Sequence, residues 1–346
     1  MPNIAEDPRI DPRLKQMLLA MPAVPNPGDA TSRDELVEQA NSPAGLARAA
    51  ELESIFEAVD SEPTAPQSGL NVEMRTAISQ PDGNTVNLQV IRPDTSDTLP
   101  CIYYIHGGGM QTMSCFYGNY RAWGKIIAAH GVVVVMIDFR NCLMASSVPE
   151  IAPYPAGLND CVSVLRQLPD LANELNFDAE NIIVAGESGG GNLTLATGMR
   201  LLKDGDIDRI KGLYALCPYI AGVWPLDESP SSVENNGIML DLHNNRGAIA
   251  YGIEEYNKKN PLAWPSFATE SDVKGLPPTM ISVNECDPLR DEGINFYRLL
   301  LSAGVRAFCR QVMGTTHGTE VFPLTAPDIA RETAVSIVAF ARGDTR

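Results

Sequence analysis

The chain has 346 residues, of which 44% are hydrophobic and 20% charged, and this balance excludes a disordered, collagen-like or fibrous protein. Its 26 basic and 43 acidic residues give a net charge of −17. Such a surface repels phosphate backbones, and no cluster of Lys and Arg offsets it, so nucleic acid is not an expected partner.

Neither a membrane span nor a secretory signal is apparent. The longest apolar run, residues 132–137, is far below the roughly 20 residues that a bilayer crossing needs. Acidic residues at Glu6, Asp7 and Asp11 stand where a signal peptide would be basic and then apolar. We therefore expect a cytoplasmic protein with no membrane partner. Its seven scattered cysteines form no C-x-x-C pair and are expected to be reduced and mostly buried.

The first third of the chain changes character once. Apolar residues recur at helical spacing between residues 8 and 62, which predicts helices before any strand. Residues 72–78 and 86–91 then alternate between apolar and polar, and the turn-rich segment 80–84 separates them. This pattern predicts an antiparallel pair of strands.

After Pro100 short apolar strands alternate with helices, which is typical of a parallel sheet covered on both faces. The alternation breaks over residues 221–274, a segment rich in Pro, Trp, Asn and acidic residues, and then resumes. An insertion of this kind usually lies above the sheet as a cap. Expected strands are 101–105, 132–138, 181–185, 212–217, 278–283 and 306–312, and expected helices are 123–129, 158–168, 193–202, 246–256, 292–303 and 326–341.

The predicted organisation is an α/β fold with a helical cap domain. Residues 1–62 form N-terminal helices that belong to the cap, and residues 63–220 form the first part of the catalytic domain. Residues 221–274 are the cap insertion, and residues 275–346 complete the catalytic domain.

A G-x-S-x-G sequence at residues 186–190 follows an apolar strand directly and precedes a helical run. In that position the motif predicts a strained strand-to-helix turn that lifts the hydroxyl of Ser188 above the sheet. The alternative is a glycine turn with an inert serine. The placement between strand and helix favours Ser188 as a nucleophile.

The sequence His-Gly-Gly-Gly at residues 106–109, called the oxyanion loop below, follows the first strand of the parallel set. Consecutive glycines leave backbone N–H groups uncovered, and such donors stabilise a developing oxyanion by roughly 3 kcal/mol each. A phosphate-binding loop is the competing interpretation, but neither G-K-[ST] nor G-x-G-x-x-G is present. His106 is expected to fix the loop locally rather than to act as a base.

A serine nucleophile needs a base and an acid, which follow it along the chain in this architecture. His317 comes directly after the last expected strand, whereas His243 lies in the insertion. Asp287 closes the strand before it and precedes a proline, and Glu285 and Asp291 are its rivals. We therefore expect a triad of Ser188, His317 and Asp287 where the strand ends meet.

These motifs together resemble the hormone-sensitive-lipase-like esterases of the α/β-hydrolase fold. The resemblance rests on the oxyanion loop, the sequence GESGGGN from Gly186, DPLRDEG from Asp287 and the final HG at His317. It implies the same triad, an oxyanion hole formed by the amides of Gly107, Gly108 and Gly189, and a cap built from the N-terminal helices and the insertion. The chain departs from the family at Glu187, where many members carry Asp or Thr, and at Gly189, where Ala is common.

The expected activity is hydrolysis of short-chain, water-soluble carboxylic esters through an acyl-enzyme, with a small-molecule ester as the only required partner. Opening of a lactone or cleavage of an amide by the same triad is the alternative. A binding protein without catalysis, like the gibberellin receptors that resemble this family, is disfavoured by the presence of His317. No metal site or cofactor is expected, and the resemblance leaves a homodimer open. Met110, Trp224 and Trp264 are expected either to line the substrate pocket or to serve ordinary packing.

Overall fold

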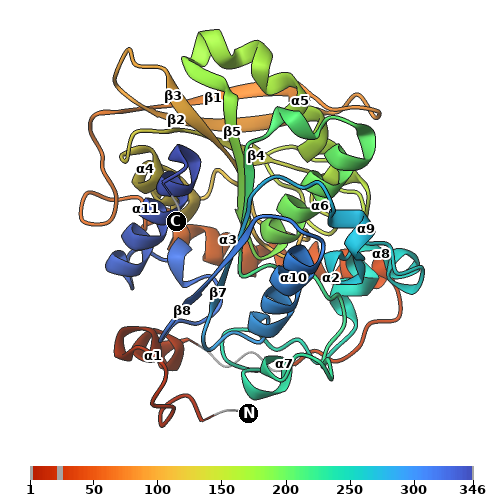
Figure 1. The fold of residues 1–346 in the computed structure, drawn as a ribbon. Helices are drawn as coiled ribbons and strands as arrows, with labels where there is room; N and C mark the ends of the chain where they lie inside the picture. The colour runs from red at the N-terminus through yellow and green to blue at the C-terminus, as the bar shows by residue number, and fades with distance from the viewer. Residues whose placement is uncertain (1–2, 22–25, 345–346) are drawn as a thin grey trace.

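A computed structural model describes residues 3–21 and 26–344 (Figure 1). Its centre is an eight-stranded sheet in the order β1-β2-β4-β3-β5-β6-β7-β8, in which the pairs β1–β2 and β2–β4 are antiparallel and all others parallel. This confirms the predicted α/β fold. The strands are β1 (Leu70–Ile78), β2 (Thr85–Pro93), β3 (Leu99–Ile105), β4 (Val133–Asp138), β5 (Phe177–Glu187), β6 (Gly212–Leu216), β7 (Thr279–Asn284) and β8 (Ala307–Val312).

Helices cover both faces of this sheet, which is why every residue of β4 is buried. On one face α4 (Gly118–Ala128) packs beside α11 (Pro327–Arg342). On the other lie α5 (Ala156–Leu175), α6 (Gly189–Asp204) and α10 (Arg290–Ser302). The predicted helices are present, although α5 extends beyond both expected ends and α10 begins at Arg290 rather than at Glu292.

The N-terminal helices do not all pack in one place. Helix α2 (Arg33–Ala40) contacts α8 (Arg246–Asn257) of the insertion, as a shared cap requires, whereas α3 (Pro43–Glu57) packs on α4. Helix α1 (Pro12–Ala20) buries Leu14 in a small cluster with Ile238 and Ile329. The division of the chain into cap and catalytic segments stays a prediction. The remaining elements are α7 (Ser231–Glu234), α9 (Glu270–Val273), η1 (Ile207–Arg209), η2 (Pro265–Phe267) and η3 (Thr319–Val321).

Across both described ranges, no helix has the length and apolarity that a membrane crossing requires.

Candidate active site

Ser188 occupies a sharp turn between β5 and α6. Its backbone has φ +58° and ψ −117°, a conformation that L residues adopt only where the surroundings impose it. The constraint is the close approach of β3: a Cβ on Gly190 would lie 2.0 Å from the carbonyl oxygen of Ile105, and one on Gly186 would lie 2.5 Å from the same atom. The two glycines of the motif therefore permit the turn that holds the half-buried Ser188 above the sheet.

Asp287 and His317 meet at the same edge of the sheet, on the loops that follow β7 and β8. Nδ1 of His317 lies 2.8 Å from Oδ2 of Asp287, and the two side chains are 9% and 0% exposed. The other carboxylate oxygen of Asp287 accepts the amide of Leu289 at 2.9 Å. The carboxylate is therefore fixed from behind and orients the imidazole. Glu285 and Asp291, the alternatives to Asp287, have other partners. Glu285 accepts the amide of Gly314, and Asp291 accepts the amide of Ser231.

The pKa of His317 reflects two opposed effects. Burial alone would lower it, but the charge of Asp287 and the hydrogen bond to it favour the protonated imidazole more strongly. Buried Glu320 and Glu187 add to this effect, and the pKa of His317 lies above its ordinary value of 6.5. The site thus stabilises the imidazolium that forms when histidine accepts a proton.

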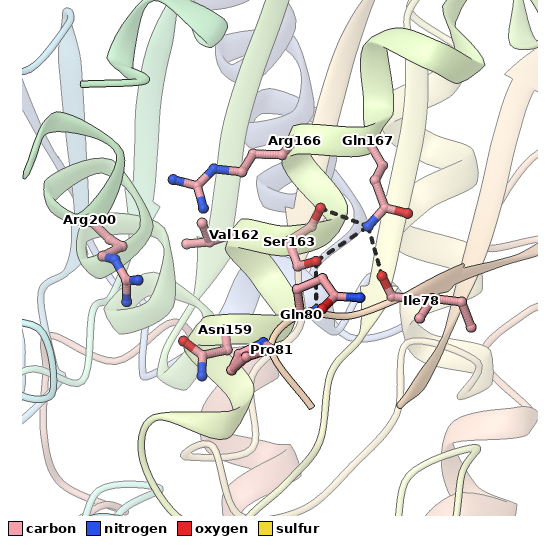
Figure 2. Close-up of a pocket in the computed structure, with 9 residues that line it drawn as sticks. All are labelled: Ile78, Gln80, Pro81, Asn159, Val162, Ser163, Arg166, Gln167 and Arg200. Atoms are coloured by element: carbon pink, nitrogen blue, oxygen red, sulfur yellow. Dashed lines mark hydrogen bonds between the residues drawn. The ribbon is translucent and has the colours of Figure 1, made fainter. Parts of the chain in front are cut away.

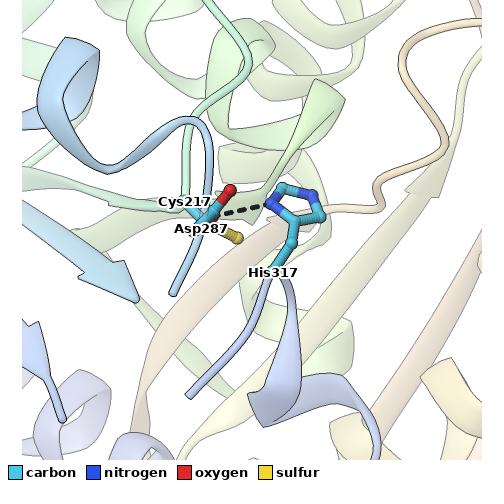
Figure 3. A group of neighbouring side chains, drawn as sticks. All are labelled: Cys217, Asp287 and His317. Atoms are coloured by element: carbon cyan, nitrogen blue, oxygen red, sulfur yellow. Dashed lines mark hydrogen bonds and ion pairs between the residues drawn. The ribbon is translucent and has the colours of Figure 1, made fainter. Parts of the chain in front are cut away.

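Cys217 completes a buried group with Asp287 and His317 (Figure 3), in which the thiol, a carboxylate oxygen and a ring nitrogen lie within 4.8 Å of one another. Metal binding would need a thiolate, yet burial and neighbouring carboxylates raise the pKa of this thiol well above its usual range. Asp287 also already holds the ring nitrogen of His317. The group therefore fits a hydrolytic triad better than a metal centre.

Cys217 also connects the Asp287–His317 pair to Ser188. The amide of Ser188 donates to the carbonyl of Leu216 at 3.0 Å, and Cys217 is the next residue. Ser188, Asp287 and His317 are thus brought to the ends of β5, β7 and β8, around the end of β6. This is where ligands bind in open α/β sheets.

The oxyanion loop differs from expectation at one residue. The amide of Gly107 donates to Oε1 of Glu187 at 2.6 Å and to the hydroxyl of Tyr120 at 3.0 Å. Because this N–H is already bonded inside the protein, it is not available to an oxyanion. The structure therefore does not support the expected role of Gly107.

Three other amides remain for that role. Among the described residues, no acceptor is hydrogen-bonded to the amide of Gly108 or of Gly109. Gly189 is the first residue of α6, where an amide has no partner within the helix. The loop lies directly against it, since a Cβ on Gly189 would be 2.8 Å from the nitrogen of Gly109 and 2.6 Å from that of Met110. This contact explains why glycine stands at position 189.

His106 and His243 take no part in the triad. The ring of His106 is fully buried, stacks on Phe139 with centroids 4.4 Å apart and contacts the carbonyl of Gly107, which suits a residue that fixes the loop. His243 instead contacts the carbonyl of Ser232 in the insertion.

The three residues expected either to line the pocket or to pack are all buried. Met110 is 1% exposed, Trp224 4% and Trp264 0%. Trp264 lies edge-on against Tyr219 and Tyr251 in the core. These side chains are packed in the core, and their expected place at the substrate pocket stays a prediction.

A shallow pocket elsewhere carries no reacting group. It lies between α5, Arg200 of α6 and the turn after β1 (Figure 2). There Gln167 donates to the carbonyl of Ile78 and to Ser163, and Arg166 is paired with Asp204 and Asp206. These contacts anchor the turn on α5, and neither the triad nor the oxyanion loop borders the pocket.

The sequence signals missed the residues that surround the triad. Glu187 stands inside the motif but was singled out only as a departure from the family pattern. Its partners Tyr104 and Tyr120 belong to no motif, and neither does Glu320, which accepts a hydrogen bond from Asn284. Only the periodicity of β3 and α4 indicates that the two tyrosines are buried.

Comparisons with known proteins agree with this geometry. The family model described as alpha/beta hydrolase fold matches residues 102–321. The chain belongs to this family. Esterase Est22 is 62% identical over 99% of both chains, with a TM-score of 0.96. Brefeldin A esterase, described as a bacterial homologue of human hormone-sensitive lipase, is 33% identical over 97% of this chain and 94% of its own, with a TM-score of 0.84. Carboxylesterase NlhH of Mycobacterium tuberculosis is 31% identical over 72% of this chain and 76% of its own. The predicted resemblance to hormone-sensitive-lipase-like esterases is thus confirmed.

Proposed function

We propose that the protein is a serine carboxylesterase that hydrolyses short-chain, water-soluble esters. The observation that carries this proposal is the buried 2.8 Å contact between His317 and Asp287, beside the strained turn that presents Ser188. The names of similar proteins, carboxylesterase NlhH and esterase Est22, support the same reaction.

In the first half of the proposed reaction, Oγ of Ser188 attacks the ester carbonyl carbon while His317 takes the serine proton. The carbonyl π electrons move to oxygen, and the amides of Gly108, Gly109 and Gly189 stabilise that oxyanion. The tetrahedral intermediate collapses, the bond to the alkoxy oxygen breaks, and His317 returns the proton to the leaving alcohol. Asp287 keeps the imidazole oriented and stabilises its positive charge throughout.

In the second half, water attacks the acyl-enzyme and gives its proton to His317. Collapse of the second tetrahedral intermediate releases the carboxylic acid, and Ser188 recovers its proton from His317. This chemistry consumes one water per ester, and its groups all come from the chain itself.

The preference for small esters follows from what fills the space behind the nucleophile. The carbonyl of Ser188 accepts the amide of Tyr219, whose ring packs on Trp224 with centroids 4.8 Å apart and on Trp264 at 5.8 Å. Met110, which follows the oxyanion loop directly, is also buried. A long acyl chain would have to displace these packed side chains.

The test is hydrolysis of 4-nitrophenyl esters with about two to about twelve acyl carbons by the wild type, Ser188→Ala and His317→Ala. We expect the highest kcat/KM at short chains and losses of several orders of magnitude in both variants. An amide and a lactone of the same acyl size should react far more slowly than the ester. A folded wild type that cleaves the amide or lactone but not the ester would refute the esterase assignment, and better turnover of long chains would refute the size preference.

We further propose that the protein works in a reducing, cytoplasmic environment. All seven cysteines are free, and six of them are buried, with only Cys309 exposed. Protein purified without reductant should therefore show seven thiols after denaturation and one reactive thiol when native. Fewer thiols after denaturation would indicate disulfides and contradict this proposal.

A further inference from the structure

Glu187 is a buried carboxylate that the proposed reaction does not use, although it precedes the nucleophile directly. Glu187 is only 2% exposed. Oε1 accepts the amide of Gly107 at 2.6 Å and the hydroxyl of Tyr120 at 2.5 Å, and Oε2 accepts the hydroxyl of Tyr104 at 2.6 Å. The three donors come from the oxyanion loop, α4 and β3, so this side chain connects three separate parts of the fold.

A carboxylate in this position is costly for the fold. Burial raises the pKa of Glu187 to about 7, and the ion pairs found in the described ranges do not include it. Other buried acids lie nearby, since the charges of Asp287, Glu320 and Glu187 all raise the pKa of His317. A packed apolar residue or a neutral amide would avoid this cost, so a stability role alone does not explain the carboxylate.

The oxyanion loop, in contrast, needs an anchor. Gly108 and Gly109 have φ values of +90° and +63°, and glycines lose much conformational freedom when they are held in one such conformation. The carbonyl of Gly108 accepts the amides of Gln111 and Thr112, which fixes the far end of the loop. The near end is fixed through the amide of Gly107 by Glu187 and Tyr120.

We infer that Glu187, held by Tyr104 and Tyr120, is a positioning residue that aims the amides of Gly108 and Gly109 at the oxyanion formed on the carbon attacked by Ser188. This inference rests on the proposed esterase function and deepens it. None of the hydrogen bonds that the carboxylate of Glu187 accepts comes from a triad side chain, and its link to the oxyanion loop is the amide of Gly107. Because Glu187 and Ser188 are adjacent in the chain, the same turn fixes the nucleophile and the loop that stabilises its intermediate.

A positioning role predicts a distinctive kinetic pattern. The oxyanion exists in the transition state but not in the bound ester, so a misaimed amide lowers kcat and leaves KM almost unchanged. Complete loss of one oxyanion donor costs about 100-fold to 1,000-fold in kcat. Misalignment without loss should cost less, and we expect about 10-fold to 100-fold for Glu187→Ala, with a change in KM below about 3-fold.

Glu187→Gln separates hydrogen bonding from charge. The glutamine carbonyl can accept the amide of Gly107, and its NH2 group can donate to Tyr104, whose hydroxyl also accepts. If positioning is the role, this variant should keep kcat within about 5-fold of the wild type. Tyr120→Phe removes one of the two acceptors of the Gly107 amide and should give an intermediate loss. It also provides a second variant if Glu187→Ala does not fold.

The matched control is Glu292→Ala. Glu292 is a similarly buried carboxylate with three donors, the amides of Ile220 and Ala221 and the indole of Trp224, and none of them belongs to the oxyanion loop. Both alanine variants should lose stability. A trifluoromethyl ketone is attacked by Ser188 and forms a tetrahedral adduct that carries an oxyanion. Only Glu187→Ala should weaken its binding, and by the same factor by which kcat falls.

Amide hydrogen exchange in the oxyanion loop supplies a readout that does not need esterase activity. Exchange at Gly107 to Gly109 should be faster in Glu187→Ala than in the wild type and unchanged in Glu292→Ala. The inference is overturned if folded Glu187→Ala has the same loop exchange and the same ketone affinity as the wild type. It is also overturned if Glu292→Ala changes the loop exchange and the ketone affinity as much as Glu187→Ala does. Absence of ester turnover in the wild type would refute the proposed function alone, because the exchange result would still show whether Glu187 holds the loop.

Discussion

Two buried carboxylates flank the nucleophile and have different surroundings. On the base side, Asp287 binds the imidazole of His317 and one backbone amide. On the oxyanion side, Glu187 binds two tyrosine hydroxyls and the amide of Gly107. The base side joins two groups that carry opposite charges during the reaction. The oxyanion side has only neutral donors around its carboxylate.

This difference indicates that charge matters most on the base side and geometry most on the oxyanion side. Glu187 does help to raise the pKa of His317, but less than Asp287 and Glu320 do. An amide in place of Asp287 removes the charge that stabilises the imidazolium and offers a donor where His317 also donates. An amide in place of Glu187 keeps an acceptor for the loop. The two amide variants should therefore differ by orders of magnitude, although both wild-type carboxylates are almost inaccessible to solvent.

The largest expected effect is that of Asp287→Asn. It should lower kcat about 10⁴-fold, because the asparagine amide favours the wrong imidazole tautomer and leaves the imidazolium without a counter-charge. Turnover of a 4-nitrophenyl ester checks this value. Asp291→Asn is the control, since Asp291 pairs with Arg290 and Ser231 away from the triad. If kcat falls by less than about 10-fold in Asp287→Asn, the charge of Asp287 is not needed for catalysis.

Next in size is a structural effect on the oxyanion side. Gly190→Ala would place a Cβ 2.0 Å from the carbonyl oxygen of Ile105, so β3 and the serine turn would have to separate. We expect the free energy of unfolding, measured with denaturant, to fall by about 1–3 kcal/mol or more. Gly205→Ala, at the open C-terminal end of the same helix, should cost only about 1 kcal/mol for its positive φ. Equal losses in the two variants would show that the close approach is not a constraint.

The fold and the triad could be predicted because their signals are local in the sequence. Apolar runs such as that of β4 and the glycines around Ser188 each indicate their structure from a few consecutive residues. The hydrogen bond of Gly107 could not be predicted in this way. It depends on Tyr104, Tyr120 and Glu187, which are far apart in the chain and meet only when β3, α4 and β5 pack, so the loop sequence alone did not show which amide is already bonded.

The pH dependence of activity tests the role of charge around His317. His317 must be neutral to accept a proton, so kcat/KM should fall as the pH drops through its pKa, which lies above 6.5. Glu320 raises this pKa by its charge, and Glu320→Gln should move the acidic limb of the profile to lower pH by a fraction of a unit. The profile between about pH 5 and pH 9 measures the shift. A shift to higher pH would contradict the assignment of His317 as the base.

The smallest expected effect is on thermal stability. Burial raises the pKa of Glu187 to about 7 and that of Glu292 to about 8, above the ordinary value of 4.5. Between these pH values the folded state holds protons that the unfolded chain has already lost, so this contribution to stability is complete below about pH 4.5, declines as the pH rises toward 7 and 8, and is gone above them. The lowered pKa of His106 acts in the opposite sense, but below pH 6.5.

We therefore expect Tm to fall between about pH 6.5 and pH 8 at constant ionic strength, to level off above pH 8, and to fall less in Glu292→Gln. Calorimetry in buffers of low ionisation enthalpy measures both slopes. A Tm that rises over this range in the wild type would show that the two carboxylates are fully ionised in the folded protein at neutral pH.

The most direct test of Ser188 as the nucleophile is to identify the residue that reacts with a dialkyl fluorophosphate or a similar organophosphate ester. We expect one covalent adduct per chain, located on Ser188 by peptide mass spectrometry, with loss of esterase activity in proportion to labelling. Ser188→Ala should form no adduct, and Asp287→Asn should be labelled very slowly. Labelling of another residue, or inactivation of the wild type without an adduct on Ser188, would contradict the assignment of the nucleophile to this turn.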